Sequence, residues 1–186
     1  MLFRSYIDKI KYFILSTQVK KKKRSQVVIN LEKAKFIKVF CQIDNSGDYN
    51  SMITFLEVLE QKKVSFSVLC FVNDTENITG FGNNSFTKRI ICMNPRKTKF
   101  FGKKEDELNS FLNEPCDIFV DLCLKDSIAI DYISGLTTAS FKVGSYSRTK
   151  KYHDLLIDVK DTQNIKYLSE QILHYLVLIN PSTKNT

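Results

Sequence analysis

The 186-residue chain has no tryptophan, only two histidines and no long apolar run, and each shortage excludes a class of protein. No apolar stretch approaches the roughly 18–20 residues that a membrane span requires, and Arg4, Asp8 and Lys9 interrupt any signal-peptide core. We therefore expect a cytoplasmic protein. Because His153 and His174 are the only histidines, no cluster has the ligand spacing of a zinc site, and we predict neither a metal nor a cofactor.

Catalytic motifs are also missing. The five cysteines are an odd number and none forms a CxxC pair, which favours reduced and buried thiols. His153 has no serine or cysteine partner in a recognisable nucleophile motif, and the chain has no GxGxxG nucleotide fingerprint. Whether the protein is an enzyme therefore stays open. The cysteines are Cys41, Cys70, Cys92, Cys116 and Cys123.

Positive charge is concentrated at the N-terminus. Residues 1–35 contain ten Lys or Arg and two acids, which accounts for the whole net charge of +8, and the rest of the chain is neutral. Apolar residues at helical spacing also run through this basic extension, namely Phe3, Ile7, Ile10 and Ile14. The pattern predicts an amphipathic basic helix whose apolar stripe packs on the body of the protein or on a second copy. Contact with a membrane surface or with nucleic acid is the alternative, nucleic acid being the less favoured.

Strand-like and helix-like segments alternate from residue 36 onward. Right-handed crossovers between such segments predict an α/β fold, a single Rossmann-like three-layer domain with a mostly parallel sheet of about six strands. We predict the strand order 3-2-1-4-5-6. The predicted divisions are a helical extension (1–35), the α/β domain (36–180) and a tail (181–186). Strands are expected at 36–42, 64–72, 88–93, 116–122, 140–144 and 154–159, and helices at 48–62, 103–112, 126–137 and 162–179.

In such sheets ligands bind outside the carboxyl ends of the strands, where the strand order reverses. With the predicted order this point lies between the first and fourth strands. The first strand leads into Ser46, Gly47 and Asp48, where backbone N–H groups at a helix start can cradle phosphate, although the same residues are typical of a simple helix cap. The fourth strand ends at Asp121, with Lys125 nearby, a candidate catalytic acid or ion pair.

Two basic loops are further candidates. Gly144 and Ser145 begin a loop with hydroxyls and cations, as in a phosphate site, although an exposed linker has the same composition. Residues 88–104 contain seven cations, no acid and two interleaved phenylalanines, which is typical of single-stranded nucleic acid binding. Residues 105–131 contain eight acids and one lysine, so a solvated loop neutralised by its neighbours is the favoured interpretation.

The second half of the chain resembles a known family. The stretch CDIFVDLCLKDSIAIDYISGLTTASFKVGSYS, followed by YHDLLIDV and a long final helix, resembles a bacterial domain-of-unknown-function family of similar length and Rossmann-like layout. That resemblance implies a fold but no activity. The Gly47-Asp48 turn, the Asp-Ile-Phe-Val-Asp strand and the following Phe-Lys-Val-Gly are more weakly similar to the N-terminal half of heptosyltransferase-type glycosyltransferases, which use a second Rossmann domain that this chain does not contain.

The sequence favours a non-catalytic cytoplasmic α/β module that acts through protein or membrane-surface contacts. The main alternative is a protein that binds a nucleotide or sugar phosphate at the switch point of the sheet. The second alternative is nucleic-acid binding through the basic extension.

Overall fold

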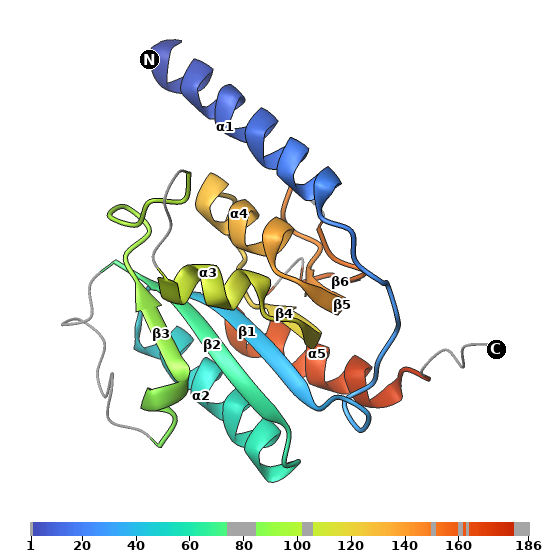
Figure 1. The fold of residues 1–186 in the computed structure, drawn as a ribbon. Helices are drawn as coiled ribbons and strands as arrows, with labels where there is room; N and C mark the ends of the chain where they lie inside the picture. Colours follow the sequence, from blue (N-terminus) through green and yellow to red (C-terminus); the bar gives the residue numbers. More distant parts are fainter. Residues whose placement is uncertain are drawn as a thin grey trace.

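The computed structural model of the protein describes residues 2–73, 85–101, 106–149, 152–159, 162 and 164–180, with side chains from Ile7 onward. These residues form a single α/β domain around one six-stranded sheet (Figure 1). Apart from a short 3₁₀ turn at Thr87–Arg89, the elements are α1 (Leu2–Lys21), β1 (Phe36–Ile43), α2 (Ser46–Gln61), β2 (Ser65–Val72), β3 (Ile90–Met93), α3 (Asp106–Asn113), β4 (Cys116–Asp121), α4 (Ile128–Leu136), β5 (Ala139–Ser145), β6 (Leu155–Ile157) and α5 (Ile165–Leu178).

The strand order β3-β2-β1-β4-β5-β6 confirms the predicted order, and every neighbouring pair is parallel. Successive strands are added in one direction across the sheet from β1 to β3 and in the other direction from β4 to β6, which places the switch point between β1 and β4, where the sequence predicts it. The central strands are buried on both faces, as their near-continuous apolar sequences require. The carboxyl ends of β1 and β4 are therefore the edge at which a ligand site is expected.

Helices cover both faces of the sheet. Helices α2 and α5 share one apolar core with the sheet, and α3 and α4 share the other (Figure 1). Helix α2 begins after Asn45, whose side chain accepts a hydrogen bond from the Asp48 amide, and α4 begins after Ser127, which caps it in the same way. The apolar stripes of these helices bury their side chains against the strands, and this packing holds the strand-end loops in place.

Two buried lysines on the strands cap the carboxyl ends of two helices. Lys38 of β1 donates to the Phe111 and Glu114 carbonyls at the end of α3, both at 2.5 Å. Lys142 of β5 donates to the Ser134 carbonyl near the end of α4 at 2.7 Å. Cationic groups stabilise the unpaired carbonyls and negative dipole of a helix end, so each lysine fixes a helix to the sheet. Burial lowers the pKa of both lysines.

The basic extension lies against the body through α1 and the linker that follows it. The Tyr12 hydroxyl donates to Asp131 of α4 at 3.0 Å, and Leu15 is fully buried. The linker continues along the body, since the Val27 amide donates to Ser140 and the Leu31 amide donates to Leu176. No helix in the described part of the chain is long and apolar enough to cross a membrane.

The predicted apolar stripe is not the face that docks, and this expectation was wrong for a single copy of the chain. Ile7, Ile10 and Ile14 are exposed, and the side chain of Phe3 lies outside the described residues. The helix turns Tyr12, Leu15 and Val19 inward, because the polar Asp131 offers Tyr12 a partner that an isoleucine could not use. The predicted division at residue 35 stays a prediction, and residues 181–186 lie outside the described part.

The exposure of the cysteines gives a first testable prediction. Cys92 on the edge strand β3 is exposed, whereas the other four thiols are buried. In the native protein a maleimide reagent should label Cys92 alone. The reaction should be slow at neutral pH, because partial burial of the thiol raises its pKa to about 12. Mass spectrometry should show one adduct, no adduct in Cys92→Ser, and five adducts in denaturant. A second adduct on the native protein would contradict the buried placement of the others.

Candidate functional site

A small cavity of about 230 Å³ lies at the switch point, between the loops that follow β1 and β4. Asp48 and Lys125 of the predicted site residues line it, and Gly47 lines the neighbouring groove between α2 and α5. Ser46 is the first residue of α2, half-buried at the same edge. The cavity is lined by Gln42, Asp44, Asn45, Asp48, Leu124, Lys125 and Ile165.

The side chains of Asn45 and Asp48 are engaged with the first loop itself. Asn45 accepts from the Asp48 amide at 3.0 Å, and the Asp48 carboxylate accepts from the Asp44 amide at 3.1 Å. The Asn45 side-chain amide also donates to Asp48 at 3.0 Å. This reciprocal pattern is that of a helix cap, in which the side chains satisfy amide groups that a phosphate would otherwise bind.

One cation and two carboxylates set the charge of the switch-point cavity. Lys125 donates to Asp44 at 2.6 Å and so joins the two loops. Burial acts to raise the pKa of Asp44, but hydrogen bonds from Lys125 and Gln42 hold it below its usual value. Burial raises the pKa of Asp48. A phosphate placed here would meet an excess of negative charge, so the cavity favours polar or cationic groups over a nucleotide.

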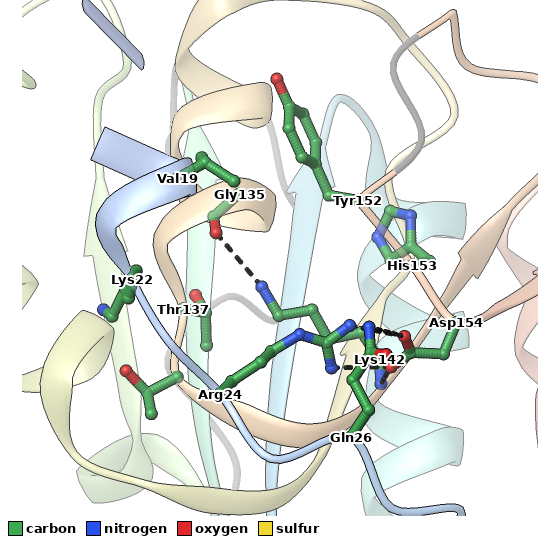
Figure 2. Close-up of a pocket in the computed structure, with 11 residues that line it drawn as sticks. Val19, Lys22, Arg24, Gln26, Gly135, Thr137, Lys142, Tyr152, His153 and Asp154 are labelled. Atoms are coloured by element: carbon green, nitrogen blue, oxygen red, sulfur yellow. Dashed lines mark hydrogen bonds and ion pairs between the residues drawn. The ribbon is translucent and has the colours of Figure 1, made fainter. Parts of the chain in front are cut away.

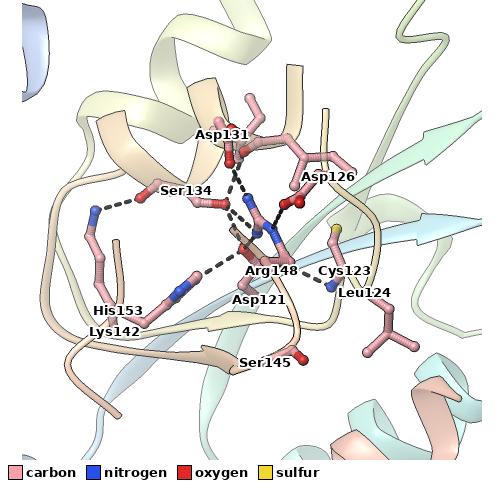
Figure 3. Close-up of polar contacts among 12 residues, drawn as sticks. Asp121, Cys123, Leu124, Asp126, Asp131, Ser134, Lys142, Ser145, Arg148 and His153 are labelled. Carbon is pink, nitrogen blue, oxygen red and sulfur yellow. Dashed lines mark hydrogen bonds and ion pairs between the residues drawn. The ribbon is translucent and has the colours of Figure 1, made fainter. Parts of the chain in front are cut away.

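Asp121 does not reach this cavity, because its side chain is fully buried beneath α4 (Figure 3). Its carboxylate forms an ion pair with Arg148, accepts from the Ser134 hydroxyl at 2.5 Å and lies 3.0 Å from His153 Nε2. The Cys123 amide also donates to it at 2.9 Å. Four polar groups from three segments therefore converge on one carboxylate.

Arg148 joins this carboxylate to a second one. Its guanidinium donates to Asp131 of α4 at 2.5 Å, and Asp126 lies 3.9 Å from its Nε. Burial acts to raise the pKa of Asp121, but Arg148 and His153 hold it far below its usual value. Burial acts to lower the pKa of Arg148, but Asp121 and Asp131 raise it. Arg148 therefore stays charged and fixes the β5–β6 loop on α4.

The arrangement of these buried side chains indicates a role in holding the fold together. The Ser134 hydroxyl donates to Asp121 rather than to His153, so these residues do not form a Ser-His-Asp relay. Ser134, Asp121 and Arg148 are all buried, which keeps water and substrate from the carboxylate. Among the described residues, no three His, Cys, Asp or Glu side chains gather as metal ligands.

The remaining predicted site residues, Gly144 and Ser145, lie at the end of β5. Gly144 lies directly beneath the His153 ring, where a side chain would have no space. Ser145 is buried and shares a 2.7 Å hydrogen bond with Ser147. Neither residue shares the switch-point cavity with Asp48 and Lys125. Arg148 and Ser134 were missed from the sequence, although two acids in buried segments, Asp121 and Asp131, implied that a buried cation must neutralise them.

The basic segment at 88–104 does not display an aromatic platform in its described part. Phe100 is buried against Phe71 and Tyr132, with ring centroids 5.6 and 5.7 Å apart. Arg89 pairs with Glu60 at 2.8 Å and lies over the Phe66 ring. These contacts belong to the core and its rim, and residues 102–105 lie outside the described part.

Fold and site define a class: a Rossmann-like α/β protein with acidic, self-capped loops at its switch point and a buried Asp–Arg–Asp network behind them. The chain belongs to the family of unknown function DUF6913, which it matches over residues 8–179. This confirms the expected resemblance to a domain-of-unknown-function family. No curated protein matches the chain significantly.

A solved structure also matches. It is an exopolyphosphatase-related protein from Bacteroides fragilis, with 12% sequence identity and a TM-score of 0.48. The match covers 80% of this chain and 40% of the other, so this chain spans less than half the length of that protein. At this level the match carries no further conclusion. Neither of these two matches is to a heptosyltransferase.

Proposed function

We propose that this protein is a non-catalytic module that attaches to anionic membrane surfaces through the outer face of α1. The outer face consists of four large apolar side chains on the side of the helix away from α4, namely Ile7, Ile10, Phe13 and Ile14. They are 47%, 46%, 72% and 39% exposed. This cluster carries the proposal, because a soluble helix rarely presents four such side chains together without a partner.

Helix α1 uses one face to pack on the body and leaves the outer face exposed, which supports the proposal. Tyr12, Leu15 and Val19 hold the helix on the body through contacts with Asp131 and the α4 core. The outer face is therefore presented on a helix that is already anchored. A module of this form docks with little loss of conformational freedom, since the helix need not fold on contact.

Charge favours a lipid surface over a second copy of the chain. Lys9, Lys20, Lys21 and Lys23 are exposed on α1 and just after it. Two copies joined through their outer faces would bring together two extensions that each carry +8, and the charges would repel. An anionic membrane contributes about 1 kcal/mol for each lysine near its surface, and about 1.5–3 kcal/mol for each large apolar side chain that is fully buried.

The proposal is tested by vesicle co-sedimentation. The protein should sediment with vesicles of phosphatidylglycerol and phosphatidylcholine, much less with phosphatidylcholine alone, and its binding should weaken as salt rises. Ile10→Glu/Phe13→Glu should reduce binding to the anionic vesicles at least tenfold, because it places two carboxylates at the lipid contact. Both positions are exposed, so the thermal unfolding midpoint should not change.

The matched control uses an exposed apolar pair on another helix. Val177 and Leu178 on α5 are 46% and 60% exposed. Val177→Glu/Leu178→Glu adds the same charge and should leave vesicle binding intact. Equal loss in both double variants would contradict the assignment to α1. A dimer in light scattering that Ile10→Glu/Phe13→Glu converts to monomer, without vesicle binding by the wild type, would assign the outer face to self-association instead.

A further inference from the structure

A second, larger cavity of about 380 Å³ lies beside the C-terminal end of α1, where the linker after α1 crosses the end of α4 (Figure 2). The linker contributes Lys22 and Arg24, β5 contributes Lys142, and the segment before β6 contributes His153 and Asp154. None of these residues lines the switch-point cavity. The cavity is thus a separate site, made jointly by the basic extension and the body.

Positive charge exceeds negative charge in this cavity. Asp154 is paired with Arg24, with contacts of 2.8 and 2.5 Å. Lys22 donates to the Leu112 carbonyl at 3.0 Å and to the Leu136 carbonyl. Carbonyls satisfy hydrogen bonds without neutralising a charge, so Lys22 keeps its positive field and adds to that of Lys142.

Among the described residues, the Lys142 ammonium has two hydrogen-bond acceptors, which leaves one donor for a ligand. Its Nζ donates to the Ser134 carbonyl at 2.7 Å and to the Gly135 carbonyl at 3.3 Å, and an ammonium has three donors. Burial, followed by repulsion from Arg24 and Lys22, lowers its pKa to about 7. An anion near this amine would relieve both effects, so ligand binding and protonation of Lys142 are coupled.

His153 supplies an independent sign of a ligand. Its ring is fully buried and lines the cavity, and Nε2 lies 3.0 Å from the Asp121 carboxylate. Within the described part of the chain, Nδ1 is buried and has no hydrogen-bond partner. Buried polar atoms in native proteins are nearly always satisfied, so an orphaned ring nitrogen at a cavity wall indicates a missing partner.

We propose that this cavity binds the phosphate group of a small phosphorylated molecule, held by Lys142, the positive field of Lys22 and Arg24, and His153. Phosphate oxygens accept from the Lys142 amine, and Nδ1 of His153 forms a further hydrogen bond with the phosphate group. The volume exceeds that of a phosphate alone and lies at the small end of ligand pockets, which leaves room for a short organic group. This site does not depend on membrane attachment.

The test is calorimetric titration of the wild-type protein with inorganic phosphate and with glycerol 1-phosphate, at constant ionic strength set by chloride. Both should bind, and Lys142→Met should weaken binding at least tenfold. Lys38→Met is the matched control, because Lys38 is an equally buried strand lysine that caps a helix outside the cavity. It should lose stability but keep phosphate affinity. Binding that Lys142→Met leaves unchanged, or no binding by the wild type, would overturn the proposal.

A second readout applies if Lys142→Met does not fold. In wild-type protein with ¹³C-labelled lysine, saturating phosphate should shift the Lys142 titration upward by at least one pH unit. The groups that face this amine are Lys22, Arg24, His153, Asp154 and Cys116, and a midpoint that phosphate leaves unmoved would overturn the site.

Vesicle co-sedimentation separates free phosphate from a lipid headgroup. If the phosphate belongs to a lipid, the protein should bind vesicles of phosphatidic acid more tightly than phosphatidylglycerol vesicles of equal charge. Arg24→Gln should then remove this difference in binding. Free-phosphate binding should persist in Ile10→Glu/Phe13→Glu, which distinguishes failure of this site from failure of the membrane proposal.

Discussion

Arg148→Met is expected to lower the free energy of unfolding by about 3–5 kcal/mol, the cost of breaking a buried ion pair by removing one partner. The guanidinium neutralises both Asp121 and Asp131, and methionine would leave two carboxylates buried without a cation. Asp121 has a strongly lowered pKa in the folded state, so its contribution to stability is present above pH 4 and is lost as the pH falls through the folded value. The variant should lose that contribution at neutral pH.

Urea unfolding followed by circular dichroism measures this effect. Arg89→Met is the control, because Arg89 pairs with Glu60 at the surface, where such pairs contribute about 0–1 kcal/mol. Adding Asp121→Asn and Asp131→Asn to Arg148→Met should restore part of the lost stability, since the uncompensated charges are removed. Equal costs for Arg148→Met and Arg89→Met would show that the network contributes little.

Gly144→Ala is expected to destabilise the fold by about 1–3 kcal/mol, the usual cost of overpacking. The added methyl would lie 2.7–2.8 Å from three atoms of the His153 ring. That ring cannot move away easily, because it contacts Asp121 on one side and stacks on Phe119 on the other. The backbone of Gly144 is also fixed by pairing with β6.

Gly47→Ala provides the comparison, since the sequence also predicted Gly47 to be a ligand-binding residue. A methyl there would approach only the end of the Asn45 side chain, and alanine favours the helix that begins here. Its cost should stay within about 1 kcal/mol. If thermal unfolding ranks Gly47→Ala as the more damaging change, the close contact between Gly144 and His153 is not a constraint on the fold.

Much of the fold could be predicted because strands and helices alternate in the sequence. The apolar runs at β1, β2 and β4 are continuous, as in strands buried on both faces, and the short connections restrict the order of the sheet. Two lysines interrupt the apolar strand sequences, Lys38 in β1 and Lys142 in β5. Their place in the core became clear only from the structure, because their partners are backbone carbonyls, which have no signature in a sequence.

The site was less predictable because a side chain at the end of a strand can point toward either face of the sheet. Asp44 and Asp121 lie at the carboxyl ends of two apolar strands, the edge at which the sequence predicted a ligand site. The structure turns Asp44 toward Lys125 and Asp121 toward Arg148, 27 residues further along the chain. The direction of a side chain at the end of a strand depends on which partner reaches it. The docking face of α1 was mispredicted for the same reason, since Asp131 attracts Tyr12.

The contacts of the basic extension connect the two ends of the chain, which has a consequence for the order of events on the ribosome. Asp131 is synthesised 119 residues after its partner Tyr12, and Asp154 is synthesised 130 residues after its partner Arg24. At about 5–20 residues per second, synthesis of the partners takes roughly 6–26 seconds. The nascent chain thus displays its basic helix, with both faces uncovered, before the domain that anchors it exists. Any partner that recognises this helix can bind it during translation.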